Sequence, residues 1–173
     1  KEVVVRVLDA RVGPRVGVAL LGETGDAMGA NAVNTMAEAV APFLEELTGG
    51  RAGLRILSNL ADHRIARARA VFKKDAIGGE EVVDKMIAAY AFAAADPYRA
   101  ATNNKGIMNG IIPVVIAPGN DTRPLQSGAP AYAARSGQYP PFAPWAKHPH
   151  GDRVGPNDMP QSVGPGGGTT NIT

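Results

Sequence analysis

The spacing of apolar residues changes along this chain, and that change limits the folds the chain can adopt. Residues 2–8 are rich in β-branched residues with an alternating pattern, and the apolar segment VGVALLG follows at residues 16–22. These two segments predict a pair of antiparallel strands around the turn RVGPR. Residues 31–47 then follow helical spacing, and Pro42 is expected to kink that helix or to divide it into two pieces.

The same sequence of patterns repeats before residue 96. Residues 52–60 and 64–72 predict a second pair of strands, and an amphipathic helix is expected to start near Glu80. The expected order is therefore β-β-α-β-β-α. That order predicts an α+β fold of the split β-α-β type, with an antiparallel sheet and helices on one face.

The composition changes after residue 96. A loop is expected to lead into a buried helix that starts near Asn104, and residues 127–137 are a second helix candidate. The rest of the chain is rich in proline and glycine, which is typical of segments that order poorly alone. The motif KHPHGD, residues 147–152, has no further ligand at suitable spacing, so we predict no metal site.

The overall composition excludes several classes of protein. Of 173 residues, 45% are hydrophobic, which is enough for a substantial core. The 18 basic and 16 acidic residues give a net charge of +2, so neither nucleic acid nor an anionic membrane is expected as a partner. Without cysteine, disulfides and thiolate metal sites are excluded. No signal peptide or apolar run of about 18 residues is present, so we expect a cytoplasmic protein.

Lys105 is the first candidate for a chemical role. The motif NNKGIMNG places it at the start of an apolar segment, where we expect it to be partly buried. Asp121, in the motif GND, follows that segment. If the two side chains meet, they form a cation that could stabilise an oxyanion. A solvated lysine at a helix start and an aspartate in a turn explain the same residues, so both interpretations stay open.

Other motifs also allow two interpretations. DAMGAN, residues 26–31, could bind a phosphate through backbone N–H groups at a helix N-terminus, or Asp26 could simply cap that helix. Arg99 could hold a carboxylate or phosphate with its planar fork, or lie on the surface. Asn59 ends a predicted strand, where ligand-binding side chains often project, although turns use the same residue type.

Several motifs together carry a resemblance to a known family. GDAMGANAVNTMAEAVAP, LRILSNLAD, DPYRAATNNKGIMNGI and GND occur in that order over nearly the whole chain, and GAPAYAARSG fits the same pattern. With these motifs the chain resembles the 3-hydroxy-3-methylglutaryl-coenzyme A (HMG-CoA) reductases of the bacterial, second class. The resemblance implies that the chain is the middle of a longer enzyme.

The resemblance gives each candidate residue a role. Family enzymes reduce a thioester to an alcohol by two hydride transfers from a nicotinamide cofactor, or run in reverse. Lys105 would be the catalytic lysine that stabilises the oxyanion, and Asp121 the aspartate that tunes it. Arg99 and Asn59 would hold the substrate, and Asn109 would support this centre. The cofactor-binding candidates are Asp26, Met28, Gly29 and Asn31.

The resemblance also implies a division into two parts. Residues 1–77 would belong to a small dinucleotide-binding domain with a ferredoxin-like split β-α-β fold. Residues 78–173 would belong to a larger, helix-centred domain that binds coenzyme A and carries the catalytic groups. NAD(H) is favoured over NADP(H), and the substrate would be HMG-CoA or mevalonate, with coenzyme A as substrate or product. Family sites form between subunits, so a homodimer or larger homo-oligomer is expected.

Departures from the family pattern keep other hypotheses open. The family's catalytic glutamate and its thiolate-protonating histidine have no match in these 173 residues, so we expect no turnover from this chain alone. Ile112 stands where the family usually has an aspartate. The first alternative is therefore a catalytically incomplete nucleotide-binding, coenzyme A-binding or assembly module derived from the family. An unrelated ferredoxin-like regulatory domain is the second.

Overall fold

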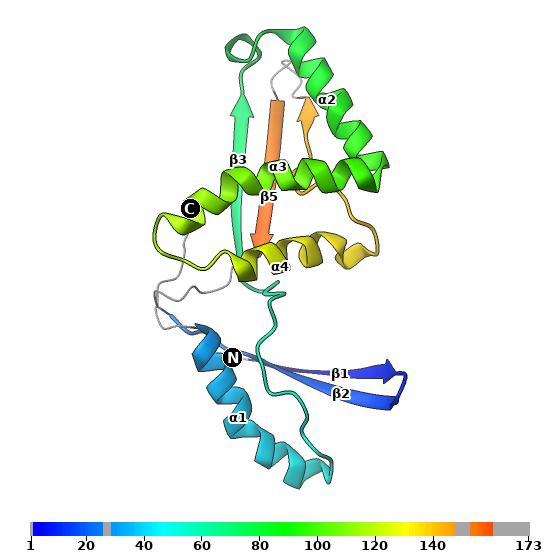
Figure 1. The fold of residues 1–173 in the computed structure, drawn as a ribbon, viewed down its shortest axis with the longest axis vertical. Helices are drawn as coiled ribbons and strands as arrows, with labels where there is room; N and C mark the ends of the chain where they lie inside the picture. The colour runs from blue at the N-terminus through cyan, green and yellow to red at the C-terminus, as the bar shows by residue number, and fades with distance from the viewer. Residues whose placement is uncertain (1, 26–28, 148–152, 161–173) are drawn as a thin grey trace. The chain divides into compact units, whose positions relative to one another are not determined.

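The fold mixes α-helices and β-strands in two compact units (Figure 1). The computed structural model describes residues 2–25, 29–147 and 153–160, the last of these through the backbone only. Among these residues, unit 1 ends at Ser58 and unit 2 starts at Asn59. The domain boundary predicted after residue 77 divides a cofactor-binding part from a catalytic part. The division into compact units does not test these roles, so that boundary stays a prediction.

Unit 1 starts with a long hairpin. β1 (Glu2–Ala10) and β2 (Gly13–Leu21) pair in antiparallel register along their whole lengths, as the sequence predicts. Side chains that share a face of this ribbon alternate along each strand. One face carries a row of solvent-exposed valines, which are Val3 (60% exposed), Val5 (61%), Val7 (78%) and Val16 (65%).

The helix α1 (Gly29–Thr48) follows the hairpin. It continues as one helix of 20 residues with Pro42 inside it, so the proline does not divide it. The helix lies close to the end of β2, because a Cβ atom built at Gly22 would come within 3.0 Å of the Met36 side chain. Glycine at this position therefore permits the close approach of strand and helix.

The predicted strand at residues 52–60 is not observed in the described structure. Two backbone N–H groups of this segment donate to side chains of α1 instead. Ala52 N donates to a Glu45 oxygen at 2.7 Å, and Leu57 N donates to Asn34 Oδ1 at 2.9 Å. Because α1 satisfies these donors, the segment runs along the helix and joins no sheet.

Unit 2 contains an antiparallel sheet with the strand order β3–β5–β4. β3 (Ile65–Phe72) matches the strand predicted at residues 64–72, and alanine and arginine alternate along it. Its partner is β5 (Arg153–Pro160) from the proline-rich region, and β4 (Ala146–Lys147) adds a short third strand. The predicted order β-β-α-β-β-α is therefore wrong, because the second strand pair forms between distant segments.

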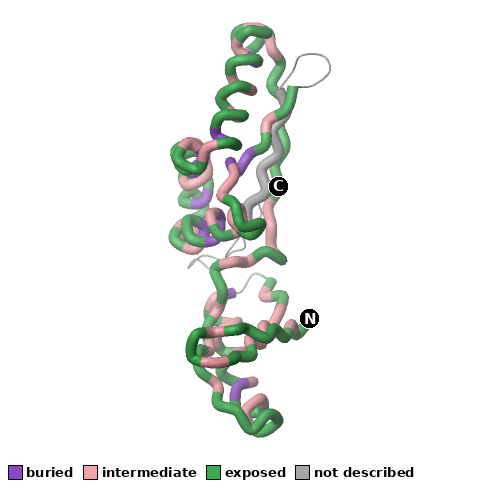
Figure 2. Tube along the Cα trace, turned by 90° about the vertical axis from the view of Figure 1, so that its right-hand side faces the viewer, coloured by how far each residue is buried: buried purple, intermediate pink, exposed green. Residues whose placement is uncertain are grey.

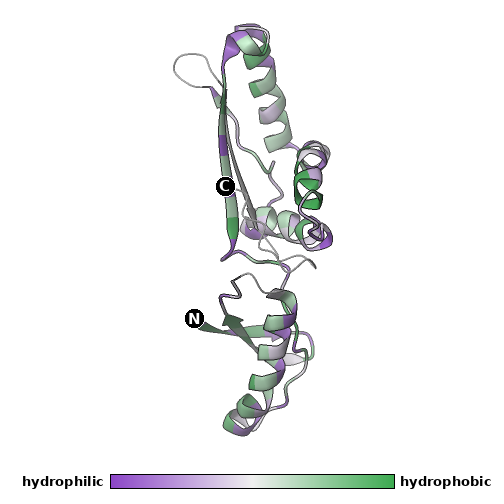
Figure 3. Ribbon diagram, turned by 90° about the vertical axis from the view of Figure 1, so that its left-hand side faces the viewer, coloured by the Kyte–Doolittle hydropathy of each residue, from purple (hydrophilic) through white to green (hydrophobic). Residues whose placement is uncertain are grey.

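Helices cover one face of this sheet (Figures 1 and 3). The elements are α2 (Glu80–Ala95), α3 (Pro97–Ile116) and α4 (Arg123–Ala133), with short 3-10 turns at Lys74–Ala76 and Ala134–Ser136. α2 starts where predicted, whereas α4 starts and ends earlier than the predicted residues 127–137. Among the residues the structure describes, no helix is both long and apolar enough to cross a bilayer.

Lys147 joins the sheet to α2. Its ammonium donates to Glu80 at 2.9 Å and to Asp84 at 2.8 Å. Hydrogen bonds to Asp84 and Glu80 raise the pKa of Lys147, and the hydrogen bond from Lys147 lowers the pKa of Glu80. The short strand β4 is therefore anchored by charge at the first turns of α2.

α3 starts at Pro97, ahead of the predicted start near Asn104. The carboxylate of Asp96 accepts hydrogen bonds from Tyr98 N at 3.1 Å and Arg99 N at 3.3 Å. Pro97 occupies the first helical position, where no N–H group is needed. The dipeptide Asp-Pro is therefore a helix start, although the sequence analysis took it for part of a loop.

The core of unit 2 lies between α3, α4 and the loop that follows α4. Figure 2 marks its buried positions, and the core cluster consists of Met108, Val115, Leu125, Ala129 and Phe142. Ile112 packs against this cluster. An apolar side chain at position 112 therefore has a packing role in this fold.

One buried polar side chain belongs to the same core. Asn104 is only 1% exposed, and its Nδ2 donates to Pro140 O at 2.9 Å. Its Oδ1 accepts a hydrogen bond from Phe142 N at 2.7 Å. Both ends of the amide are thus paired with the backbone of the loop after α4, as a buried amide requires.

Substitution Asp96→Ala tests the start of α3. Removing the carboxylate leaves two N–H groups of the first turn without their acceptor, which should destabilise the helix start by about 1 kcal/mol. Hydrogen–deuterium exchange at Tyr98 and Arg99 should become about fivefold faster. The control Asp62→Ala removes an exposed carboxylate outside any helix and should leave exchange in α3 unchanged. Equal exchange in both variants would contradict the cap.

Candidate functional site

Lys105 and Asn109 lie one turn apart on the exposed side of α3. The ammonium of Lys105 donates to Oδ1 of Asn109. The prediction of a partly buried lysine is wrong, because Lys105 is exposed. Asn104 and Met108 occupy the buried side of the same helix turns, which leaves the side of Lys105 facing solvent.

Glycines follow both of these polar residues. Gly106 and Gly110 are exposed, and a Cβ atom built at either position would meet nothing within 4 Å. Glycine inside a helix costs about 1 kcal/mol relative to alanine. The surface around Lys105 therefore leaves the helix backbone open to close approach by another molecule.

Asp121 lies in the turn between α3 and α4. The chain reverses at Gly119, which has a φ of 81°, a conformation that favours glycine. The Asp121 carboxylate accepts hydrogen bonds from Arg123 N at 2.9 Å and from the Arg123 guanidinium at 2.6 and 2.9 Å. These hydrogen bonds hold the pKa of Asp121 below its usual value of 3.8.

The chain does not bring Lys105 and Asp121 into contact. Lys105 lies about three turns before the end of α3, whereas Asp121 lies beyond that end. The lysine is paired with Asn109, and the aspartate with Arg123. The tuning of Lys105 by Asp121 therefore stays a prediction.

Arg99 and Asn59, the two other predicted substrate-binding residues, do not join the Lys105–Asn109 pair. Arg99 is half-buried in the first turn of α3, where its backbone N–H is held by Asp96. Asn59 is exposed in the loop that begins unit 2. Among the described residues, neither side chain has a hydrogen bond to Lys105.

The predicted cofactor-binding residues belong to unit 1. Gly29 is the buried first residue of α1, and Asn31 is exposed in its first turn. Asp26 and Met28 lie outside the described residues, as do residues 148–152 of the KHPHGD motif. The described part of the chain contains no group of three His, Asp or Glu side chains that could hold a metal ion.

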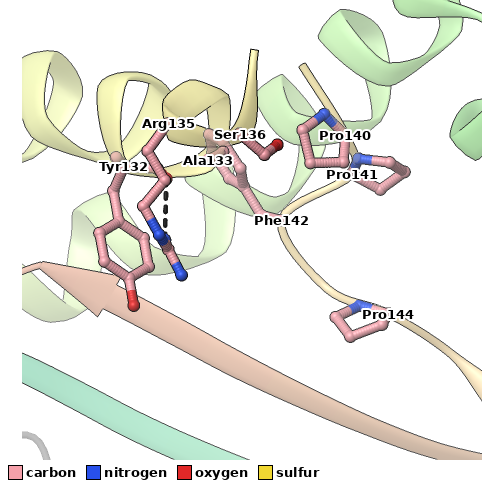
Figure 4. A pocket seen from close by; sticks show the side chains of 9 residues that line it. Tyr132, Ala133, Arg135, Ser136, Pro140, Pro141, Phe142 and Pro144 are labelled. Carbon is pink, nitrogen blue, oxygen red and sulfur yellow. Dashed lines mark hydrogen bonds between the residues drawn. The ribbon is translucent and has the colours of Figure 1, made fainter. Parts of the chain in front are cut away.

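A groove of about 340 Å³, which the sequence did not predict, lies at the C-terminal end of α4 (Figure 4). The Arg135 guanidinium lies 3.7 Å from the centroid of the Tyr132 ring and donates to Tyr132 O at 2.9 Å. Arg135, in the 3-10 turn that follows, therefore caps the C-terminal end of α4. Pro140, Pro141 and Phe142 form the opposite wall. The motif PPFAP, residues 140–144, is the sequence feature that could have predicted this wall, because adjacent prolines favour an extended loop.

Comparison with known proteins gives a consistent result. The family model described as hydroxymethylglutaryl-coenzyme A reductase matches residues 2–173. The 3-hydroxy-3-methylglutaryl-coenzyme A reductase of Archaeoglobus fulgidus is 54% identical over 172 residues, which are 99% of this chain and 39% of that protein. A probable reductase of the same name from Borreliella burgdorferi is 38% identical over 151 residues, which are 84% of this chain and 35% of that protein.

Solved structures agree with these sequence matches. The 3-hydroxy-3-methylglutaryl-coenzyme A reductase of Streptococcus pneumoniae is 38% identical with a TM-score of 0.89, over 95% of this chain and 46% of that chain. A class II structure from the same organism, bound to NADPH in open conformations, gives the same identity and TM-score over 41% of its chain. The present chain thus spans about two fifths of the length of its curated relatives.

Substitution Arg123→Gln tests the environment of Asp121. Losing the guanidinium should raise the pKa of Asp121 toward 3.8 in a carbon-13 NMR titration of the carboxyl signals. The pKa of Asp121 is lower in the folded protein than in the unfolded chain. The pairing with Arg123 therefore stabilises the fold fully above the unfolded pKa, and this stabilisation is lost as pH falls through the folded pKa. The control Arg69→Gln, on β3, should leave the titration of Asp121 unchanged. A wild-type Asp121 that titrates like the Arg123→Gln variant would contradict the pairing.

Proposed function

The chain belongs to the hydroxymethylglutaryl-coenzyme A reductase family, and we propose that the protein containing it interconverts HMG-CoA and mevalonate with a nicotinamide cofactor. The observation that carries this proposal is the 54% identity to the Archaeoglobus fulgidus reductase over 99% of the chain. No described residue favours a catalytically incomplete module, since the unusual Ile112 is accounted for by packing against the core.

Lys105 would supply the main electrostatic contribution of this chain. When hydride adds to the thioester carbonyl, negative charge develops on the oxygen, and an ammonium within hydrogen-bond reach stabilises it. The same group would act again at the aldehyde stage. Asn109 already holds the ammonium, which restricts the positions that the lysine can take. The neighbouring glycines leave room for a substrate close to α3.

Asp121 and Arg99 would act on charge and orientation. Asp121 is ionised at neutral pH, and its hydrogen bonds from Arg123 lower its pKa further, so its charge can favour the protonated form of a lysine that comes near it in the complete site. The guanidinium of half-buried Arg99 suits the carboxylate of the substrate, because its fork can donate two parallel hydrogen bonds. Asn59 would add a further polar contact.

Unit 1 offers a donor set that fits a dinucleotide. The 20-residue helix α1 starts with glycine, and the N–H groups of a helix N-terminus favour a pyrophosphate. A nicotinamide cofactor supplies hydride when it is bound. The preference for NAD(H) has no support from the comparisons, since the Streptococcus pneumoniae structure is bound to NADPH. We therefore propose a nicotinamide cofactor of either kind.

We propose that residues 1–77 contribute to a ferredoxin-like dinucleotide domain and residues 78–173 to the coenzyme A and catalytic domain. A homodimer, a cytoplasmic location and the absence of turnover by these 173 residues alone complete the proposal. Size-exclusion chromatography with light scattering on the full-length protein checks the oligomer.

Substitution Lys105→Ala in the full-length protein tests the proposed chemistry. Loss of the ammonium should lower kcat for NAD(P)H oxidation with HMG-CoA by about 100- to 1,000-fold, because charge on the oxygen is then left unstabilised. The matched control is Lys85→Ala on α2, whose ammonium pairs only with exposed Glu81 among the described residues and should leave kcat unchanged. Near-normal turnover of the Lys105→Ala variant would end the assignment.

The choice of cofactor is a separate prediction. Turnover of the full-length protein should require either NADH or NADPH, and kcat/KM measured with each at fixed HMG-CoA gives the preference. Substitution Asn31→Ala should raise the KM for the cofactor with little change in the KM for HMG-CoA, because Asn31 lies in the first turn of α1. The control Glu46→Ala, which is exposed in the last turn of the same helix, should leave both values unchanged. A rise in the KM for HMG-CoA alone would contradict the placement.

A further inference from the structure

The part of α3 that carries Lys105 is a weak helix by itself. Gly106 and Gly110 each cost about 1 kcal/mol of helix propensity relative to alanine. Pro113 has no N–H group, so the carbonyl of Asn109 has no partner at the usual helical position. This segment therefore depends on contacts outside the helix to keep one conformation.

Asn104 supplies such a contact one residue before Lys105. Its amide donates to Pro140 O at 2.9 Å and accepts from Phe142 N at 2.7 Å, and the residue is 1% exposed. The two hydrogen bonds fix both the position and the rotation of α3 at this turn. With Asn104 held inward, the next residue must project toward the exposed side, where Lys105 meets Asn109.

We propose that Asn104 is a positioning residue for the proposed reductase reaction, acting by locking the turn of α3 that presents Lys105. The inference rests on the role proposed for Lys105. It goes beyond that role because the buried side chain of Asn104 hydrogen-bonds the loop after α4 and not Lys105. The effect should therefore appear in turnover and not in substrate affinity.

The first experiment compares Asn104→Leu with a matched core variant of the full-length protein. Asn104→Leu removes both hydrogen bonds at similar volume, and kcat per folded molecule should fall by about 10- to 100-fold, with KM for HMG-CoA changed by less than about threefold. Val115→Ala weakens apolar packing on the buried side of the same helix but leaves both hydrogen bonds of Asn104 to the loop in place. Its kcat per folded molecule should stay within about twofold of the wild-type value.

A second variant gives a readout that packing alone would not produce. In Asn104→Asp, one carboxylate oxygen can still accept from Phe142 N, but the other faces the carbonyl of Pro140. Protonation restores a donor to that carbonyl, and burial shifts this protonation toward neutral pH. Activity relative to the wild-type protein should therefore increase as the assay pH is lowered from 8 to about 5.5.

The outcomes separate this inference from the proposed function. If Lys105→Ala abolishes turnover while Asn104→Leu matches Val115→Ala, the positioning role is wrong and the reductase assignment stands. If Asn104→Leu does not fold, the Asn104→Asp variant decides: a ratio to wild-type activity that is flat with pH overturns the inference, and a rise at low pH supports it. If Lys105→Ala retains turnover, the role proposed for Lys105 is wrong and the inference fails with it, whereas a wild-type full-length protein without turnover would overturn the proposed function itself.

Discussion

The buried carboxamide of Asn104 joins α3, the helix that carries Lys105, to the loop that follows α4. Asn104 on α3 binds backbone groups that follow it by 36 and 38 positions in the chain. Leaving one of these buried groups unpaired costs about 1–3 kcal/mol, so helix and loop separate only at considerable cost. The loop in turn forms one wall of the groove beside α4, and its Phe142 completes the core.

Carboxylates at helix starts compensate for the many glycines and prolines of unit 2. Asp96 satisfies two N–H groups of α3, Asp121 holds the first turn of α4 through Arg123, and Glu80 at the start of α2 receives Lys147. Each acid lies where the helix dipole favours negative charge. Helices of this composition therefore begin at defined residues even though their interiors are poor helix formers.

Local patterns in the sequence predict the local elements of the fold, because strand alternation and helical spacing depend on near neighbours. The hairpin, α1, β3 and α2 were predicted in this way. The pairing of β3 with β5 was not, since it joins segments far apart in the chain and depends on the whole core. The strand expected at residues 52–60 does not form, because Glu45 and Asn34 accept hydrogen bonds from its backbone. The alternation of residues in the sequence does not reveal these hydrogen bonds. The motifs identified Lys105 and Asn109 as candidates but not the contact between them. The partial burial predicted for Lys105 was wrong, because burial depends on which side of α3 faces the core, and local sequence does not reveal that.

The exposed valines of the hairpin have a consequence for how unit 1 behaves in solution. Fully burying one aliphatic side chain contributes about 1.5–3 kcal/mol, so covering Val3, Val5, Val7 and Val16 would release several kcal/mol. Each strand of this two-stranded sheet also has an outer edge without a partner strand in the described structure, on which further strands can add. Preparations of this chain should therefore self-associate increasingly with concentration and salt, and charged substitutions on that face should keep the material dispersed.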